Sequence, residues 1–194
     1  MQFFHTLLIA SFCIFHTAFA MDEVNILAKI NQTVVTNYDV ENRIEFLQFT
    51  MPEIKKASSD ERKYYAMQSL IQDKLRSEYI KKTNFKLNKE EKKHNRGEII
   101  IDIKKKNIPN INSILAKNDD FLENEVMWRG VIDGVIRPKI QISPEIVSEI
   151  LAKNRNISKE KAEKIAIDQQ IQMQSAQIIE AMRKISIIEF TQEK

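Results

Sequence analysis

Ser186-Ile187-Ile188-Glu189-Phe190, close to the end of the chain, is the stretch that decides the fold. Its β-branched residues predict a strand, and a lone strand needs a partner. The other predicted strands lie far away at 24–35, where apolar residues alternate from Val24 to Ile30 and Asn31-Gln32 forms a turn. We therefore expect the two ends of the chain to pair in a small antiparallel sheet that closes one domain.

Between these strands the sequence predicts helices almost throughout. Apolar spacing and capping residues place them at 37–51, 58–82, 89–106, 111–118, 121–137, 144–152 and 159–184. Pro52 and Pro138 end the first and the fifth of these helices. The expected fold class is mainly α, a single multi-helix domain with a small antiparallel sheet that pairs the N-terminal hairpin with the C-terminal strand.

Composition excludes several classes of protein. The chain has 194 residues, of which 43% are hydrophobic and 29% charged, so it is neither disordered nor fibrous in character. It contains only 3 glycines, too few and too dispersed for a glycine-rich phosphate-binding loop. The net charge of +3 is too small to indicate a nucleic-acid partner.

Residues 1–20 have the features of an export signal. They contain no charged side chain, and an apolar run from Leu7 to Phe19 ends in the cleavage pattern Ala18-Phe19-Ala20. We expect cleavage after Ala20 and a periplasmic location, with an uncleaved membrane anchor as the alternative. No stable membrane insertion is expected after signal removal. Cys13 leaves with the signal, so the mature chain is expected to have no disulfide.

The remaining residue chemistry does not favour an enzyme. His94 is the only histidine after residue 20, and it stands four residues before Glu98, a spacing that would give a metal only two ligands. The acidic pairs, such as Asp119-Asp120, lie near helix starts, where the helix dipole explains them. We therefore expect no catalytic residue, no metal and no cofactor.

Two further features have structural and functional interpretations. Gly130 and Gly134 are spaced so that a neighbouring helix could pack closely against them. Residues 81–106 contain ten Lys or Arg against four acidic residues, which is typical of a solvated helix face. A surface for one acidic partner on this basic helix, 89–106, is the alternative interpretation.

Some apolar residues fall outside the helical stripes expected to form the core. On the first helix that stripe is Val40, Ile44, Leu47 and Met51, and on the second it is Tyr64, Met67, Ile71, Leu75 and Tyr79. Phe46, Phe49, Tyr65 and Met173 lie off the stripes of their helices. Another element could cover each of them, but apolar residues on a second face are also expected beside a hydrophobic groove.

Three segments of the chain resemble a known family. Ala28-Lys29-Ile30-Asn31-Gln32-Thr33-Val34-Val35-Thr36-Asn37-Tyr38-Asp39-Val40 resembles the opening of SurA-type periplasmic chaperones. The run that starts at Met127-Trp128-Arg129-Gly130 and continues through Arg137-Pro138-Lys139-Ile140-Gln141-Ile142-Ser143-Pro144-Glu145-Ile146-Val147 is similar to a later helix and the segment after it, with Ile146 where an acid is common. Residues 161–190 are similar to the closing helix and strand. The resemblance covers 24–190 and divides the chaperone domain, 21–194, into an N-terminal module, 24–152, and a closing helix and strand, 158–190.

The chain departs from the family at one informative place. Parvulin-type prolyl isomerase modules normally follow the helix that starts at Ser143-Pro144, but only Lys153 to Ile157 stands there. The resemblance thus implies an ATP-independent chaperone that holds unfolded outer-membrane proteins, its clients, without isomerase activity. Phe46, Phe49, Tyr65 and Met173 are the expected client contacts. An envelope scaffold that binds an acidic partner and a degenerate isomerase are the other hypotheses, and the oligomeric state stays open.

Overall fold

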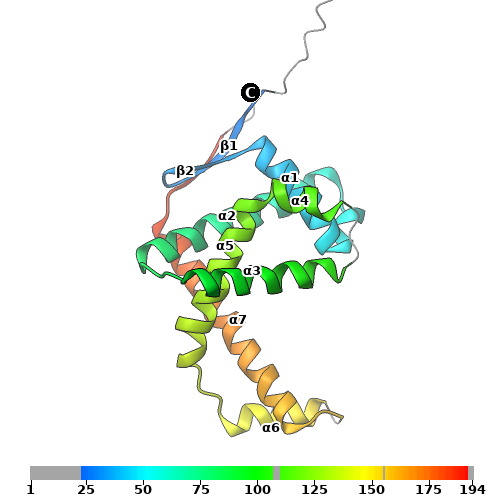
Figure 1. The fold of residues 1–194 in the computed structure, drawn as a ribbon, viewed down its shortest axis with the longest axis vertical. Helices are drawn as coiled ribbons and strands as arrows, with labels where there is room; N and C mark the ends of the chain where they lie inside the picture. The colour runs from blue at the N-terminus through cyan, green and yellow to red at the C-terminus, as the bar shows by residue number, and fades with distance from the viewer. Residues whose placement is uncertain (1–22, 107–109, 155, 192–194) are drawn as a thin grey trace, which may run out of the picture.

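The computed structural model describes residues 23–106, 110–154 and 156–191, and the export signal predicted at 1–20 lies outside them. The described chain begins and ends in one three-stranded sheet (Figure 1). Its strands are β1 (Ile26–Ile30), β2 (Thr33–Thr36) and β3 (Ile188–Phe190), in the order β2-β1-β3. Both neighbours run antiparallel to β1, so the predicted pairing of the chain ends is confirmed.

The register of the sheet decides which side chains face the helices. Ala28 pairs with Phe190 and Ile30 with Ile188, so these four side chains lie on one face. Ala28 and Ile30 are fully buried on that face. The turn of the hairpin begins at Asn31, whose φ of 52° is in the left-handed region that asparagine tolerates.

Helices make up most of the described chain, as the sequence predicts. They are α1 (Asn37–Thr50), a 3-10 turn η1 (Pro52–Lys56), α2 (Ser59–Lys82), α3 (Lys89–Lys104), α4 (Ile111–Lys117), α5 (Asp119–Val131), α6 (Pro144–Lys153) and α7 (Lys159–Ile185). Reciprocal capping boxes begin three of them, at Thr36, Ser58 and Asn88. Each box satisfies backbone N–H groups that the first helical turn cannot pair internally.

The main core lies where α1, α2, α5 and the second half of α7 meet beneath the sheet. Trp128 of α5 is the largest side chain buried within it, and Tyr79 of α2 meets its ring edge-on with centroids 5.9 Å apart. Ile71 and Leu75 of α2 are fully buried beside them. This apolar cluster joins the N-terminal helices to the closing helix as one unit.

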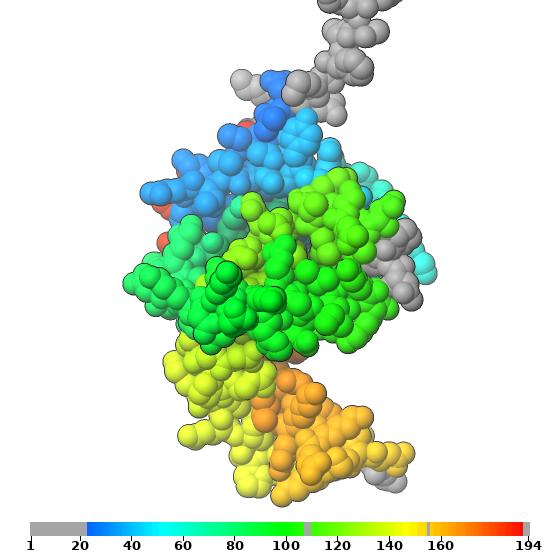
Figure 2. Space-filling view, viewed as in Figure 1, coloured from blue at the N-terminus to red at the C-terminus, as the bar shows by residue number. Residues whose placement is uncertain are grey.

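A smaller apolar cluster lies apart from the main core. It consists of Val147 and Ile150 of α6 with Ala162 and Ala166 of α7. These two helix segments form a lobe that projects from the body (Figures 1 and 2). Because α7 continues from this lobe into the main core at Ile171, one uninterrupted helix connects the two.

The fifth predicted helix, 121–137, differs from the structure at its C-terminal end. The α-helix ends at Val131 and continues as a wider π-helical turn, η2 (Ile132–Ile136), and a 3-10 turn, η3 (Arg137–Lys139). Pro138 has no N–H to donate and its ring crowds the carbonyl four residues earlier, at Gly134. The helix therefore changes its winding before the proline is reached.

The two glycines of this region are packed by a loop and not, as the sequence predicts, by a neighbouring helix. A Cβ at Gly130 would lie 2.6 Å from Leu87 Cδ2, and one at Gly134 would lie 3.4 Å from the ring of Phe85. Both side chains come from the connection between α2 and α3. The absence of a Cβ at Gly130 thus lets the loop close onto α5.

Candidate functional site

An apolar groove of about 960 Å³ lies between the sheet, α1 and α2. Its walls combine the start of β1 and the end of β3 with the first halves of both helices. The lining residues are Asn25, Ile26, Leu27, Asn37, Val40, Glu41, Ile44, Lys63, Tyr64, Met67, Gln68, Phe190 and Thr191. The groove therefore forms only when the two ends of the chain have paired.

Three large apolar side chains converge on this groove and remain exposed. They are Ile26 of β1 at 47%, Tyr64 of α2 at 61% and Phe190 of β3 at 60% of their free surface. Single exposed apolar residues are common on proteins and have no special meaning. Three from different elements around one hollow are typical of an interaction site, because their common exposure is costly without a partner.

Local structure explains how the strands present these side chains. The pairing of β1 with β2 shifts register between Ile26 and Ala28, a bulge that changes the direction of the strand beside the groove. Asn37 holds this end of the strand: its Oδ1 accepts from the Asn25 N–H at 2.9 Å, and its own N–H donates to the Asn25 carbonyl at 3.0 Å. The start of β1 is thus tied to the start of α1.

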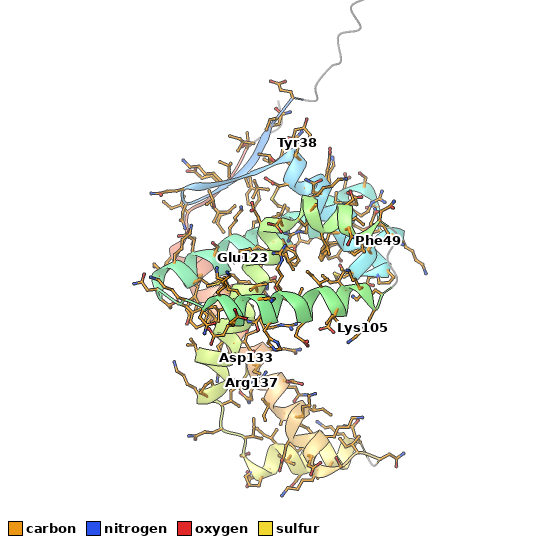
Figure 3. All side chains as sticks on the ribbon, viewed as in Figure 1. Tyr38, Phe49, Lys105, Glu123, Asp133 and Arg137 are labelled. Carbon is orange, nitrogen blue, oxygen red and sulfur yellow. The ribbon has the colours of Figure 1, made fainter. Side chains whose placement is uncertain are left out.

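Two of the four predicted client-binding residues are placed elsewhere. Phe46 is buried, with its ring centroid 4.9 Å from that of Phe121, so the prediction that it forms a surface contact is wrong. It lies off the stripe that meets α2, yet it is buried because α4 and Phe121 of α5 cover a second face of α1. Phe49, near the end of α1 (Figure 3), is half-buried beneath Lys55, whose Nζ lies 5.0 Å from the ring, and does not line the groove.

The other two predicted residues are exposed, and one of them is next to the groove. Tyr65 meets the ring of Tyr64 edge-on at 5.7 Å, so it extends the aromatic surface beside the lining. Met173 of α7 is exposed but does not line the groove. Sequence reasoning placed Tyr64 in the core and missed Ile26 and Phe190. An aromatic residue at the end of the closing strand was the available signal for Phe190.

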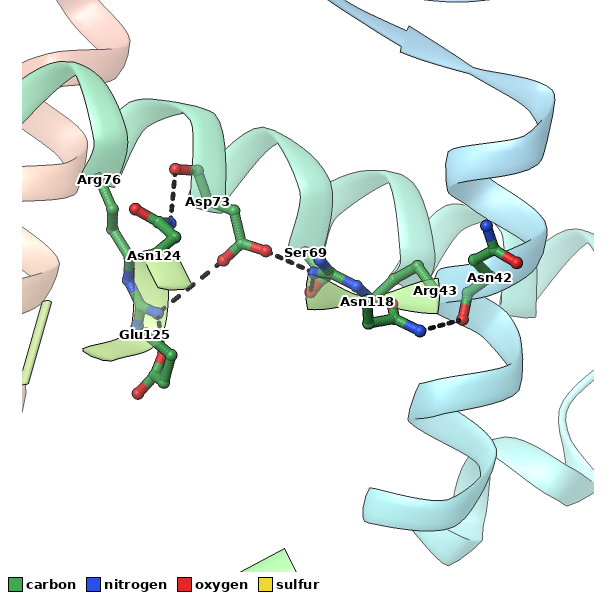
Figure 4. A network of polar contacts seen from close by, with 8 residues as sticks. All are labelled: Asn42, Arg43, Ser69, Asp73, Arg76, Asn118, Asn124 and Glu125. Carbon is green, nitrogen blue, oxygen red and sulfur yellow. Dashed lines mark hydrogen bonds and ion pairs between the residues drawn. The ribbon is translucent and has the colours of Figure 1, made fainter. Parts of the chain in front are cut away.

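A second hollow, of about 590 Å³, is lined mainly by polar residues and lies between α1, α2 and the segment that joins α4 to α5. At its base Arg43 Nη1 donates to Asp73 Oδ2 at 2.6 Å, with both side chains largely removed from solvent. Arg76 stands 3.9 Å from the other Asp73 oxygen and pairs with Glu125 at 2.8 Å (Figure 4). The network ties α1, α2 and α5 together by side-chain contacts.

Burial raises the pKa of Asp73 above its ordinary value of 3.8. The positive charges of Arg43 and Arg76 act in the opposite direction, and Glu125 adds to the increase. The Asp73 carbonyl also accepts from Asn124 Nδ2 at 2.9 Å (Figure 4). Both the carboxylate and the carbonyl of Asp73 thus have partners within the protein. We therefore assign the network a role in the stability of the fold.

Some of the positively charged side chains of the basic helix α3 form ion pairs within the molecule. Lys92 pairs with Glu123 at 2.8 Å and Arg96 with Asp119 at 2.6 Å, and both carboxylates belong to α5. Figure 3 marks Glu123 between these helices. Within the ranges that the structure describes, no group of acidic, histidine or cysteine residues is arranged to hold a metal, and no helix is long and apolar enough to cross a membrane.

Comparisons with known proteins do not identify the chain: no protein-family model matches it, and no curated protein is significantly similar to it. Its functional interpretation therefore depends on its own sequence and geometry. These define a mainly α protein whose paired chain ends and first two helices form an exposed apolar groove.

Proposed function

We propose that this protein is an ATP-independent holdase of the periplasm that binds unfolded outer-membrane proteins in the groove and has no prolyl isomerase activity. The observation that carries the proposal is the convergence of Ile26, Tyr64 and Phe190 on one apolar hollow. The leader-like residues 1–20 and the SurA-like segments of the sequence support the location and the type of client.

Client binding through this groove needs no cofactor or nucleotide. Burying one aromatic or large aliphatic side chain of a client contributes about 1.5–3 kcal/mol, from which the ordering of the client must be subtracted. Each contact is therefore weak, and a long unfolded chain is held by repeated contacts along its length. Segments held in this way are kept from meeting the exposed strand edges of other unfolded chains.

The groove accounts for client binding better than the basic helix of the alternative hypothesis. Lys92 and Arg96 of α3 already pair with carboxylates of α5, so fewer of its cations are open to an acidic partner. The groove, by contrast, has exposed aromatic residues and a mixed lining in which Lys63 and Glu41 carry opposite charges. Binding in it is expected to depend little on salt.

Light scattering of a urea-denatured outer-membrane β-barrel protein, diluted into buffer with the exported protein, tests the proposal. We expect near-stoichiometric amounts to suppress aggregation without ATP. The double variant Tyr64→Ser, Phe190→Ser should lose most of this protection because it removes two exposed aromatic rings from the groove. Met173→Ser is the control, since Met173 is also an exposed apolar residue, at 48%, but lies outside the groove.

Two results would count against the proposal. Unchanged aggregation in the presence of the folded wild-type protein would exclude a holdase for this client class. Equal loss of protection in the Met173 variant and the double variant would show that the groove is not the binding surface. Circular dichroism of each variant confirms that its helices remain folded.

A further inference from the structure

The outer edge of β3 carries backbone groups that point away from the sheet. Asn31 N–H donates to the Ile187 carbonyl at 2.9 Å, and Thr191 N–H donates to the Leu27 carbonyl at 3.0 Å. Backbone groups alternate in direction along an antiparallel strand. The N–H and C=O groups of Ile188 and Phe190 therefore face outward, and no residue in 23–106, 110–154 or 156–191 bonds to them.

On the opposite edge of the sheet one donor, at Thr36, is occupied by the chain itself, whereas the backbone groups of Val34 also face outward. On β2 the Thr36 N–H donates to Asp39 Oδ2 at 2.8 Å, and the same carboxylate accepts from the Thr36 hydroxyl at 2.8 Å. The capping box of α1 thus occupies a donor of this edge and places a negative charge beside it. An occupied donor and a nearby charge hinder further strand pairing, and the outward groups of Ile188 and Phe190 have no bonding partner among the described residues.

The open edge is continuous with the groove. The side chain of Phe190, at the end of β3, lines the groove, and the backbone N–H and C=O of the same residue face outward from the sheet. On the other face of the sheet Glu189 stands opposite Lys29, so the two faces of β3 differ in polarity. In a strand added to this edge, every second side chain would contact an apolar surface. The side chains between them would lie on the charged, solvated face.

We propose that clients bind by strand addition: an extended client segment pairs with the outer edge of β3 and inserts alternate apolar side chains into the groove. This inference rests on the proposed holdase function and specifies its substrate class. Transmembrane strands of outer-membrane barrels alternate apolar and polar residues, which matches the two faces of this edge. Backbone pairing also makes binding tolerant of client sequence, because every residue except proline supplies the same groups.

The length of the edge argues against a second copy of this chain as the occupant. Specific protein–protein interfaces bury at least about 1,000 Å². The strand that two copies would share spans only Ile188–Phe190, and a two-fold pairing would bring the Glu189 side chains of both copies close together. An extended client that also fills the groove gains apolar contacts that a symmetric pair of β3 strands lacks.

Backbone hydrogen exchange, followed by NMR in the exported protein, tests the proposal. The probe is a synthetic peptide of about nine residues, within the usual strand length, in which Tyr and Val alternate with Ser and Thr. At saturation we expect exchange of the Ile188 and Phe190 amides to slow by roughly tenfold or more, as new hydrogen bonds form. Glu189 and Thr191, which face β1, should change much less.

A matched pair of variants tests the same contact from the protein side. Phe190→Ala removes the ring and keeps the N–H, whereas Phe190→Pro removes both and leaves the bond from Thr191 to Leu27 intact. Fluorescence anisotropy of the labelled peptide should show weaker binding for the proline variant than for the alanine variant, by roughly threefold to tenfold.

The outcomes separate the two proposals. Peptide binding that perturbs Tyr64 without protecting Ile188 or Phe190 overturns strand addition and leaves the holdase proposal intact. Protection that is present without peptide and increases with protein concentration identifies a second copy as the occupant, which also overturns it. If the peptide does not bind the wild-type protein and the protein does not suppress client aggregation, the proposed function itself is contradicted.

Discussion

Asn31 Oδ1 accepts a hydrogen bond from the backbone N–H of Ile187 at 3.0 Å, although the two residues are separated by 156 positions in the chain. The same side chain donates through Nδ2 to Ser186 Oγ at 3.3 Å. Asn31 is also the hairpin residue with a positive φ. One turn residue therefore shapes the N-terminal hairpin and holds the strand that completes the groove.

Replacing Asn31 by glycine should separate these two roles. Glycine keeps the left-handed backbone conformation but removes both side-chain hydrogen bonds to the closing segment. We expect a loss of about 1–2 kcal/mol in the free energy of unfolding, measured by urea denaturation. Asn84→Gly is the control, since Asn84 also has a positive φ of 50° and makes no such contact. Equal effects of the two substitutions would contradict the assigned role of Asn31.

Gly130→Ala and Gly97→Ala should change stability in opposite directions. A Cβ at Gly130 would lie within 3 Å of three carbon atoms of Leu87, so the loop must move, at a cost of about 1–3 kcal/mol. Gly97 has open space around its Cβ position within α3, and alanine there should stabilise the helix by up to about 1 kcal/mol. Thermal denaturation measures both, and a stabilised Gly130→Ala variant would show that Leu87 moves at little cost.

Arg43→Ala should be among the most destabilising polar substitutions. It leaves the buried Asp73 carboxylate without its closest partner, which costs about 3–5 kcal/mol in typical cases. Lys117→Ala removes a pair with Glu45 of similar geometry, 2.9 Å, on the surface, where about 0–1 kcal/mol is expected. Chemical denaturation of the two variants distinguishes burial from contact distance as the source of the stabilisation, and similar losses would argue against burial.

The stability of the protein should depend on pH through Asp73. Its folded pKa is raised above the ordinary 3.8, so the folded state binds this proton more tightly than the unfolded state does. The loss of stability caused by the buried charge of Asp73 is fully present above the folded pKa, and it disappears as the pH falls toward 3.8. Relative to Asp73→Asn, the wild type should therefore gain stability as the pH is lowered from neutral. A difference between the two proteins that does not change with pH would contradict the raised pKa.

Local sequence signals predicted most of the secondary structure. The capping boxes at Thr36, Ser58 and Asn88 depend on contacts between residues three apart, so the sequence alone reveals where these helices begin. Pro52 ends α1 for an equally local reason. The pairing of the chain ends was also predictable, because β3 had no other strand to join.

The same reasoning failed for the binding residues. Periodicity shows which residues share a face of a helix but not which other elements cover that face. Phe46 is buried because α1 has neighbours on two sides, whereas Tyr64, assigned to the core stripe of α2, lies beside the groove and is exposed. Which aromatic residues stay accessible depends on packing between elements far apart in the sequence.

The sequence by itself thus determined the helices, the strands and the joining of the two ends of the chain, since these follow from contacts between near neighbours and from the need of a strand for a partner. Only the tertiary structure decided where the groove lies, that Arg43 and Asp73 form a buried pair, and that β3 keeps an open edge beside Phe190. The physical reason is that burial and open hydrogen-bonding groups are properties of surfaces assembled from distant segments.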